Sequence, residues 1–210
     1  MSLAELINKI EELKSSNVSS VIQKRIKEFE RIGRSSIKEI FKELCFCILT
    51  ANYNAKGGIR IQNAIGNGFL SLSEKQLARK LKELGHRFPN TRAKYIVEAR
   101  KMLDEIDKVL KSKLSEKEKR EWLVKNIKGL SYKEASHFLR NIGYKNLAII
   151  DFHIVDVLVR HGLIEKPKTL TKRKYPEIEE VLKKIADRVG LSLAELDLYL
   201  WYMETGVVLK

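Results

Sequence analysis

Hydrophobic positions recur at helical spacing along almost the whole of this chain. The clearest case is Ile37, Ile40, Phe41, Leu44 and Ile48, which fall on one face of a helix. The alternating apolar and polar positions that mark β-strands are absent. We therefore predict an all-α protein, with element boundaries good to about 2–4 residues. The predicted helices cover about 2–14, 17–32, 36–51, 57–67, 73–84, 91–109, 115–127, 131–141, 152–161, 176–188 and 192–204.

Several predicted helices begin with a capping box, in which a serine caps the helix and a Glu or Gln three residues later bonds back to it. The pairs are Ser2 with Glu5, Ser36 with Glu39, Ser73 with Gln76, Ser115 with Glu118, and Ser192 with Glu195. The three prolines are all predicted to lie in loops. These local signals place the helix starts independently of the hydrophobic pattern.

The stretch 125–151 joins two helical patterns through the turn Gly129-Leu130-Ser131. Ser131 and Glu134 form another capping box, at the start of the second helix. Lys133 is therefore predicted in the first helical turn, where backbone N–H groups lack partners and can hold a phosphate. Because the helix macrodipole disfavours a cation there, this position favours the neutral, nucleophilic amine of Lys133.

The composition favours a polyanionic partner. Lys and Arg total 41 against 27 Asp and Glu, which gives a formal net charge of +14. A highly charged surface of the thermophilic type explains the same numbers, and the two interpretations are compatible. No apolar run approaches the ~20 residues of a membrane span, and the N-terminus is amphipathic and charged. We therefore expect a cytoplasmic, nucleoid-associated protein without a membrane partner.

The cysteines indicate a reducing compartment. Cys45 and Cys47 are the only two, and on a helix their side chains diverge, so they are not expected to form a disulfide. Two thiolates also cannot supply the four ligands of an iron–sulfur cluster. The histidines show no metal-ligand spacing, so no structural metal site is predicted.

The segment Lys128-Gly129-Leu130-Ser131-Tyr132-Lys133, followed by Ile149-Ile150-Asp151, resembles the helix-hairpin-helix DNA glycosylases. In those enzymes a hairpin of similar pattern ends in a lysine, and an aspartate precedes a later helix. Lys128 and Ser131 stand where that pattern usually has Pro and a second Gly. The chain length and the ending LYLWYMETGVVLK resemble the compact prokaryotic type 2 8-oxoguanine DNA glycosylase/AP lyases, in which such departures are expected.

The resemblance implies a helix-hairpin-helix DNA glycosylase fold of two helical lobes, with the active site in the cleft between them. One lobe is expected to hold residues 1–56 with 150–210, and the other residues 57–149, which carry the hairpin at about 117–142. The implied partner is double-stranded DNA containing 8-oxoguanine, and we expect a monomer.

The same resemblance implies a chemistry in which the base is flipped out and excised through a lysine Schiff base, after which the abasic strand is nicked by β-elimination. Lys133 would be the nucleophile and Asp151 the carboxylate that stabilises the sugar cation. Trp201 would stack on the base, and Lys210, which carries the terminal carboxylate, would contact the base edge. No redox or organic cofactor is required.

Further residues are implied to contact DNA. Asn52 and Asn54 would lie near the orphaned base, and Phe88, with Arg92 beside it, would act as the wedge that fills the vacated stack. Gly129, Ser131 and Glu134 of the hairpin and His153 would contact phosphates. The family also implies a monovalent cation, Na⁺ or K⁺, at the carbonyls of Lys125, Ile127 and Leu130. Structural alternatives exist for many of these residues, because Asn and Asp often only cap helices and aromatic side chains often only pack.

Two other functions fit parts of the sequence. A monofunctional glycosylase for another base would keep Asp151 but generally lacks a lysine at the position of Lys133. A non-catalytic helix-hairpin-helix DNA-binding protein explains the charge and the hairpin, but not the aspartate or the aromatic tail. A helical protein with only a charged thermophilic surface explains none of these together.

Overall fold

The helices of this protein begin largely where serine side chains cap them. Complete capping boxes are present at Ser2, Ser73, Ser115 and Ser192, as predicted. Ser36 forms only half of its box, because the carboxylate of Glu39 accepts from Lys42 at 2.7 Å and not from the cap. The caps therefore account for most of the local helix boundaries.

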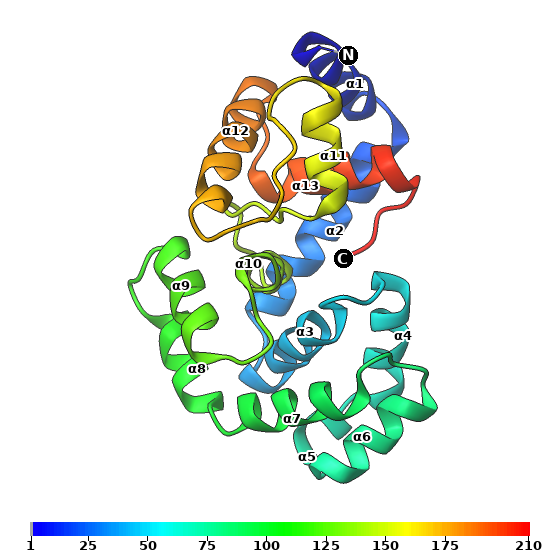
Figure 1. Ribbon diagram of the computed structural model, residues 1–210, viewed down its shortest axis with the longest axis vertical. Coiled ribbons are helices and arrows are strands. Elements are labelled where there is room, and N and C mark those ends of the chain that lie inside the picture. The colour runs from blue at the N-terminus through cyan, green and yellow to red at the C-terminus, as the bar shows by residue number, and fades with distance from the viewer. Residues whose placement is uncertain (1) are drawn as a thin grey trace.

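The computed structural model describes residues 2–210, and within this range it contains thirteen α-helices and no strand (Figure 1). The helices are α1 (Leu3–Lys14), α2 (Asn17–Gly33), α3 (Ile37–Thr50), α4 (Ala55–Ile65), α5 (Gly68–Ser71), α6 (Glu74–Glu83), α7 (Pro89–Arg100), α8 (Leu103–Lys111), α9 (Glu116–Asn126), α10 (Tyr132–Asn141), α11 (Phe152–Arg160), α12 (Lys174–Val189) and α13 (Leu193–Thr205). None of the described helices is long and apolar enough to cross a membrane.

The observed helices differ from the predicted ones in three respects. The single helix predicted over 91–109 is two helices. The N–H groups of Lys101 and Met102 bond to carbonyls three residues earlier, as in a 3₁₀ turn, and this turns the chain between α7 and α8. The short helix α5 was not predicted. Pro89 and Pro176 lie in the first turns of α7 and α12, not in loops, at positions where a missing N–H costs little.

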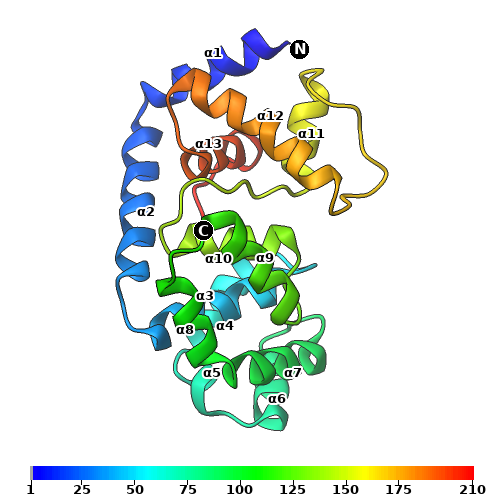
Figure 2. The same ribbon diagram turned by 90° about the vertical axis from the view of Figure 1, so that its left-hand side faces the viewer.

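Two hydrophobic cores divide the molecule into lobes, which Figures 1 and 2 show one above the other. The lower core is built by α3 to α10, and the upper core by α1 and α11 to α13. Helix α2 runs alongside both lobes, and its buried side chains pack against α13. The C-terminus lies between the lobes (Figure 1).

The expected lobe boundary differs from the observed cores at α3. The sequence placed residues 1–56 in the N/C-terminal lobe, yet the apolar residues of α3 from Ile40 to Leu49 belong to the lower core. The reason is that the second half of α3, from Leu44 to Leu49, is apolar on all sides, so it is buried at the centre of a lobe and does not pack at an edge.

Buried ion pairs connect the lobes. Arg120 of α9 donates to both carboxylate oxygens of Glu179 of α12, at 2.6 and 3.0 Å, and the same carboxylate accepts from the backbone of Ala148 at 2.9 Å. Arg140 of α10 lies 3.4 Å from Asp197 of α13. Buried charges need partners, so these pairs hold the two lobes in one relative position.

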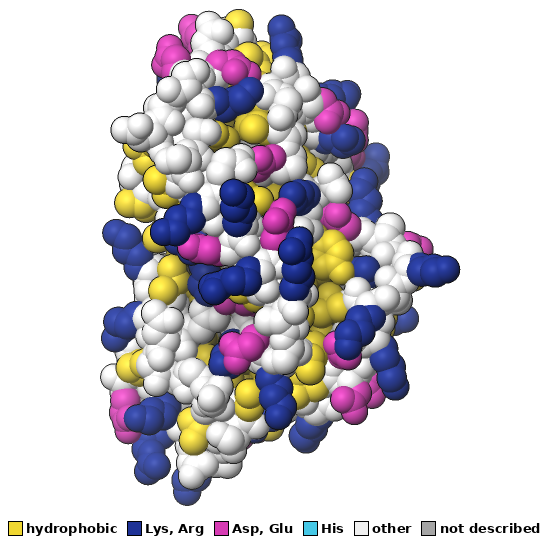
Figure 3. Space-filling view, turned by 180° about the vertical axis from the view of Figure 1, so that it is seen from behind, with side chains coloured by type: hydrophobic (Ala, Val, Ile, Leu, Met, Phe, Trp, Pro, Cys, Tyr) yellow, Lys and Arg dark blue, Asp and Glu magenta, His cyan; other side chains and the backbone are white. Residues whose placement is uncertain are grey.

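Basic side chains cover the face opposite to that of Figure 1 without forming one patch, since acidic and apolar groups lie among them (Figure 3). The positive charge on this face is therefore spread out and is not concentrated in one place. A spread of this kind fits both a thermophilic surface and general attraction to a polyanion.

Candidate active site

The hairpin predicted from the sequence joins α9 to α10. Its turn depends on Gly129, which has a φ of +89°, and a Cβ there would lie only 2.6 Å from the ring of Tyr95. A residue with a side chain would therefore be strained and would also collide with Tyr95. The predicted box at the start of α10 is present, because the Glu134 carboxylate accepts from the N–H and the hydroxyl of Ser131.

Lys133 lies in the first turn of α10, as predicted. Its side chain is 30% exposed, and its Nζ lies 3.6 Å from the carboxylate of Glu134. The apolar face of α10, including Ala135 and Phe138, is buried in the lower core. Lys133 is thus held on the opposite face of a helix that cannot rotate without exposing this core.

Asp151 caps α11 through its Oδ1, which accepts from the N–H of Ile154 at 3.0 Å. The extended segment before it is fixed by Tyr175, whose hydroxyl donates to the carbonyl of Ala148 at 2.8 Å and accepts from the N–H of Ile150 at 3.1 Å. The capping interaction holds the carboxylate in one position.

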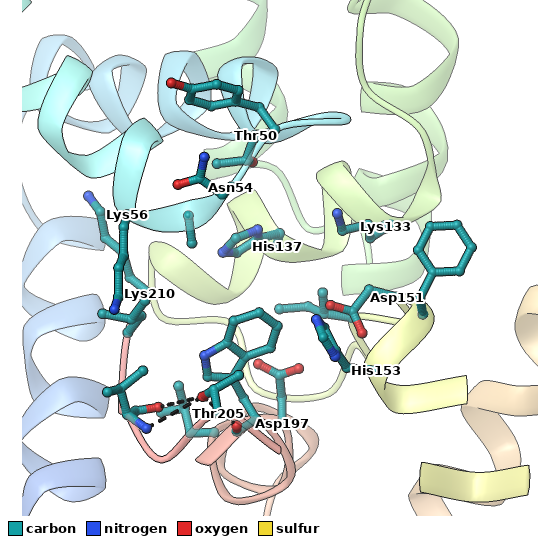
Figure 4. Close-up of a pocket in the computed structure, with 18 of the residues that line it drawn as sticks. Thr50, Asn54, Lys56, Lys133, His137, Asp151, His153, Asp197, Thr205 and Lys210 are labelled. Atoms are coloured by element: carbon teal, nitrogen blue, oxygen red, sulfur yellow. Dashed lines mark hydrogen bonds between the residues drawn. The ribbon is translucent and has the colours of Figure 1, made fainter. Parts of the chain in front are cut away.

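Lys133 and Asp151 point into one cavity of about 510 Å³ between the lobes (Figure 4). This volume is within the ~300–1,000 Å³ typical of small-molecule sites. The predicted residues that line it are Asn52, Asn54, Lys133, Asp151, His153, Trp201 and Lys210. Four separated parts of the chain therefore meet at one site: the turn after α3, helix α10, the start of α11, and the C-terminal helix with its tail.

The cavity also has an inner wall that the sequence analysis did not identify, formed by His137 and Arg140 of α10 and Asp197 of α13. Both ring nitrogens of His137 and the Nε of Arg140 are buried without a hydrogen-bond partner, whereas the Nη1 of Arg140 has only the ion pair with Asp197 at 3.4 Å. Unpaired buried polar atoms are costly, so their presence indicates a site for a polar ligand. The spacing of Lys133, His137 and Arg140 along one helix face was the available signal.

Burial controls the charge of this inner wall. It lowers the pKa of His137 well below its usual value, with Arg140 and Lys133 acting in the same direction, so the imidazole is neutral. Burial also raises the pKa of Asp197 from 3.8 to about 6, and the nearby Asp151 charge adds to this, while Arg140 and Lys133 oppose it. Asp197 thus changes its charge near pH 6.

A pH-dependent stability follows from Asp197. Because its pKa is higher in the folded protein, the folded state binds this proton more tightly than the unfolded state. The contribution of Asp197 to the free energy of unfolding should therefore fall as the pH rises from about 4 to about 6 and level off above this range. Asp197→Asn should reduce this decline, as measured by denaturant unfolding at several pH values. Identical pH slopes for the two proteins would contradict the prediction.

The Asn cluster occupies the turn after α3. Asn52 is the only described residue other than glycine with a positive φ, at 57°, a conformation that Asn tolerates better than most residues. Asn54 caps α4 by accepting from the N–H of Gly57 at 2.6 Å. Asn54 thus has the ordinary capping role and also lines the cavity. Contact of either residue with DNA stays a prediction.

Phe88 and Arg92 lie outside the cavity. Arg92 is 7% exposed, and its guanidinium donates to the carbonyl of Ala51 at 2.6 Å, so it supports the turn that carries the Asn cluster. The half-buried ring of Phe88 has the guanidinium carbons of Arg87 and Arg92 at 5.0 and 5.7 Å from its centroid. The roles of wedge and opposing-base contact stay predictions.

The aromatic and C-terminal residues form another part of the wall. Trp201 meets the ring of His153 edge-on, with the centroids 5.1 Å apart, and its indole N–H is buried without a partner. The ammonium group of Lys210 contacts Glu43 at 2.7 Å, so this charge already has a partner. The expected contact of Lys210 with the base edge stays a prediction.

The hairpin has backbone carbonyl oxygens that could bind a cation, but some of its backbone N–H groups already donate hydrogen bonds within the protein. The Ile127 carbonyl accepts a long hydrogen bond of 3.3 Å from the N–H of Leu130, and the N–H of Ser131 donates to Glu134 at 3.2 Å. Backbone carbonyls are suitable ligands for hard cations, so the Lys125, Ile127 and Leu130 carbonyls are chemically compatible with the expected monovalent ion. In residues 2–210 no group of three or more His, Cys, Asp or Glu side chains could hold a metal ion.

Comparison with known proteins decides the family. The sequence model of a helix-hairpin-helix family described as 8-oxoguanine DNA glycosylase matches residues 22–191. This chain belongs to the 8-oxoguanine DNA glycosylase family. The 8-oxoguanine DNA glycosylase/AP lyase of Korarchaeum cryptofilum is 54% identical to it over 211 residues, with 100% of both chains covered. The relative of the same name from Methanocaldococcus jannaschii is 57% identical, with 98% of this chain and 99% of the relative covered.

Solved structures of family members have the same fold. The M. jannaschii 8-oxoguanine glycosylase/lyase, in complex with a 15-mer DNA containing 8-oxoguanine, matches with a TM-score of 0.95 at 56% identity, covering 98% of this chain and 100% of that one. The 8-oxoguanine DNA glycosylase of Thermotoga maritima matches with a TM-score of 0.93 at 45% identity, covering 99% and 100%. The predicted family and the helix-hairpin-helix fold are thereby confirmed.

Proposed function

We infer that this protein is a bifunctional DNA repair enzyme that excises 8-oxoguanine from double-stranded DNA and then nicks the abasic strand. The observation that carries this inference is that Lys133 and Asp151 share a base-sized cavity with Trp201. The relatives named 8-oxoguanine DNA glycosylase/AP lyase match over the full chain, which supports the same reaction here.

Lys133 supplies the nucleophile. Its amine nitrogen bonds to C1′ of the deoxyribose, the C1′–N9 bond breaks, and the base leaves with the electron pair and takes up a proton. Loss of a proton from the nitrogen and opening of the C1′–O4′ bond then give the Schiff base. Removal of a C2′ proton expels the 3′ phosphate, which nicks the strand. The reaction needs no oxidant and no organic cofactor.

Asp151 stabilises the charge that develops on the sugar. Its carboxylate is held at the start of α11 by the Ile154 N–H and opens to the same cavity as Lys133. A negative charge that is already oriented costs no reorganisation in the transition state, which makes such interactions large. Its position near Lys133 (Figure 4) also suits it to accept a proton from the attacking amine.

The inner wall and Trp201 recognise the extruded base. Trp201 offers an aromatic surface for stacking, whereas the neutral His137 presents one donor and one acceptor. Asp197 and Arg140 add a carboxylate and a guanidinium to the lining of the same cavity. The ring nitrogens of His137 and the indole N–H of Trp201, which lack hydrogen-bond partners, would gain them when a polar base enters.

The DNA backbone is held mainly by charge. The net charge of +14 supports phosphate binding that is sequence-independent and sensitive to salt. We propose that backbone amides near Gly129, Ser131 and Glu134, together with His153, contact phosphates at the lesion. A monovalent cation at the hairpin carbonyls would add positive charge there. Asn52, Asn54 and Arg92 would lie near the orphaned base, and Phe88 would fill the vacated stack.

The two alternatives explain less. A monofunctional glycosylase does not need the lysine that opens to this cavity, and a non-catalytic DNA-binding module does not need the cavity. One chain carries both Lys133 and Asp151 at one site, so we propose that a monomer is active. A double-stranded DNA substrate supports the proposal that the enzyme works in the cytoplasm with the nucleoid.

Borohydride trapping tests the proposed function. The protein is incubated with a duplex that contains one 8-oxoguanine, and borohydride reduces any Schiff base to a stable amine. We expect a protein–DNA adduct and a strand nick at the lesion, but neither with a duplex that has guanine at that site. A released base without any adduct would indicate a monofunctional enzyme, and no excision at all would refute the proposal.

A further inference from the structure

The terminal lysine is anchored by a buried carboxylate on another helix. Its Nζ lies 2.7 Å from Oε1 of Glu43, also contacts the side-chain oxygen of Gln62, and lies 4.6 Å from the centroid of the Phe46 ring. The side chains of Lys210 and Glu43 are only 14% and 7% exposed. Glu43 is 167 residues from Lys210 in the sequence, so only the tertiary structure brings them together.

Glu43 is itself held from two other helices. The Nε2 of Gln62 in α4 donates to its Oε1 at 2.9 Å, and also to the carbonyl of Lys42 at 2.9 Å. The Nδ2 of Asn141 in α10 donates to its Oε2 at 3.1 Å. Both carboxylate oxygens are thus used by groups that converge on one point. A buried carboxylate with this many partners is fixed in position and needs the Lys210 cation to balance its charge.

The anchor lies outside the catalytic cavity. Glu43 and Gln62 line a second hollow of about 520 Å³, whereas only Lys210 lines both this hollow and the active cavity. The segment after Gly206, which ends α13 with a φ of +70°, is half-buried along its length. Chain termini of this kind fray unless something ties them down. The Lys210 side chain ties this one to the lower lobe.

We propose that Glu43, supported by Gln62 and Asn141, is a positioning residue for base excision. It holds the Lys210 ammonium group so that the C-terminal tail closes the base end of the active cavity. The ammonium group thus serves as the anchor, which leaves the rest of Lys210 to line the cavity. This inference rests on the proposed function, because it assigns a role in the recognition of the extruded base.

The test compares two substrates for Glu43→Gln, which keeps the shape of the side chain but removes its charge. Excision of 8-oxoguanine should fall about tenfold to hundredfold, the effect of losing a hydrogen bond to a charged group. Nicking of a preformed abasic site should be unchanged, because that substrate has no base to recognise. Carboxypeptidase should also remove the terminal residue faster from Glu43→Gln than from the wild type, below the melting temperature of both.

Matched variants separate the anchor from general effects. Lys210→Met keeps most of the length of the side chain but lacks the ammonium group, so its excision should fall as in Glu43→Gln. The double variant should fall no further than either single one, because both remove the same interaction. Glu39→Gln, on the exposed side of α3, is the control and should excise 8-oxoguanine at the wild-type rate.

Three results would overturn the inference. The first is normal 8-oxoguanine excision by Glu43→Gln or by Lys210→Met. The second is an equal loss of excision and abasic-site nicking in Glu43→Gln, which would make Glu43 a residue that only supports the fold. The third is additive losses in the double variant. Absence of 8-oxoguanine excision by the wild type would instead refute the proposed function, so the two failures are distinct.

Discussion

Lys133→Gln is expected to abolish the borohydride-trapped adduct with 8-oxoguanine DNA. Glutamine has nearly the same reach and helix propensity, but its amide nitrogen is not a nucleophile. The Lys133 side chain is 30% exposed and pairs only loosely with Glu134, so the fold should be retained. The measurement is the adduct on a denaturing gel, with the melting temperature and lesion binding measured in parallel.

The matched control for this variant is Lys128→Gln. Lys128 lies in the same hairpin but pairs with Glu98 at 3.2 Å and does not line the cavity. It should form the adduct at the wild-type rate, which separates loss of the nucleophile from loss of one hairpin charge. An adduct formed by Lys133→Gln as fast as by the wild type would assign the chemistry to another amine.

Asp151→Asn is expected to lower base excision by about 10²–10³-fold, the range found when one oriented electrostatic group is removed from an active site. Asparagine caps a helix nearly as well as aspartate, so the bond from the Ile154 N–H should survive and stability should change little. Single-turnover excision and thermal unfolding measure the two effects separately. Because the Asp151 charge raises the pKa of Asp197, this variant should also lower the pKa of Asp197.

Asp156→Asn is the control for the second prediction. Asp156 lies in the same helix, α11, but its side chain is 48% exposed and pairs with Lys166 at 3.0 Å. Its replacement should leave excision unchanged. If Asp151→Asn retained activity within a few-fold of the wild type, Asp151 would have only its structural role as a helix cap.

The structure agrees best with the sequence-based predictions where local interactions decide the outcome. Capping boxes and apolar periodicity depend on residues three and four positions apart, so most helix boundaries were within a few residues of those observed. The split of the predicted helix 91–109 was missed because no Pro or Gly marks the turn at Lys101 and Met102. Packing of α8 against the lower core is a long-range effect that these local signals do not contain.

Within the site, residues that belong to a local motif were predicted, and residues whose role depends on burial were not. Lys133 and Asp151 were identified from a motif, and the structure places them at one cavity. His137 was treated only as one of several histidines without metal spacing, although it lies one turn after Lys133. Its importance depends on the unpaired burial of its ring, and burial of a polar residue cannot be read from its neighbours in sequence.

The sequence by itself determined the helical class, the hairpin and the excess of positive charge, because each depends on residue types at short spacings or on composition. The assignment of Lys133 and Asp151 as a catalytic pair came from the resemblance of their motif to a family and stays a prediction. Only the tertiary structure decided that α3 belongs to the lower lobe, that Asp197 meets Arg140 and that Glu43 holds Lys210. Such contacts between distant segments form when the burial of many apolar residues together outweighs the loss of chain entropy. No single stretch of the sequence shows this combined contribution of many distant residues.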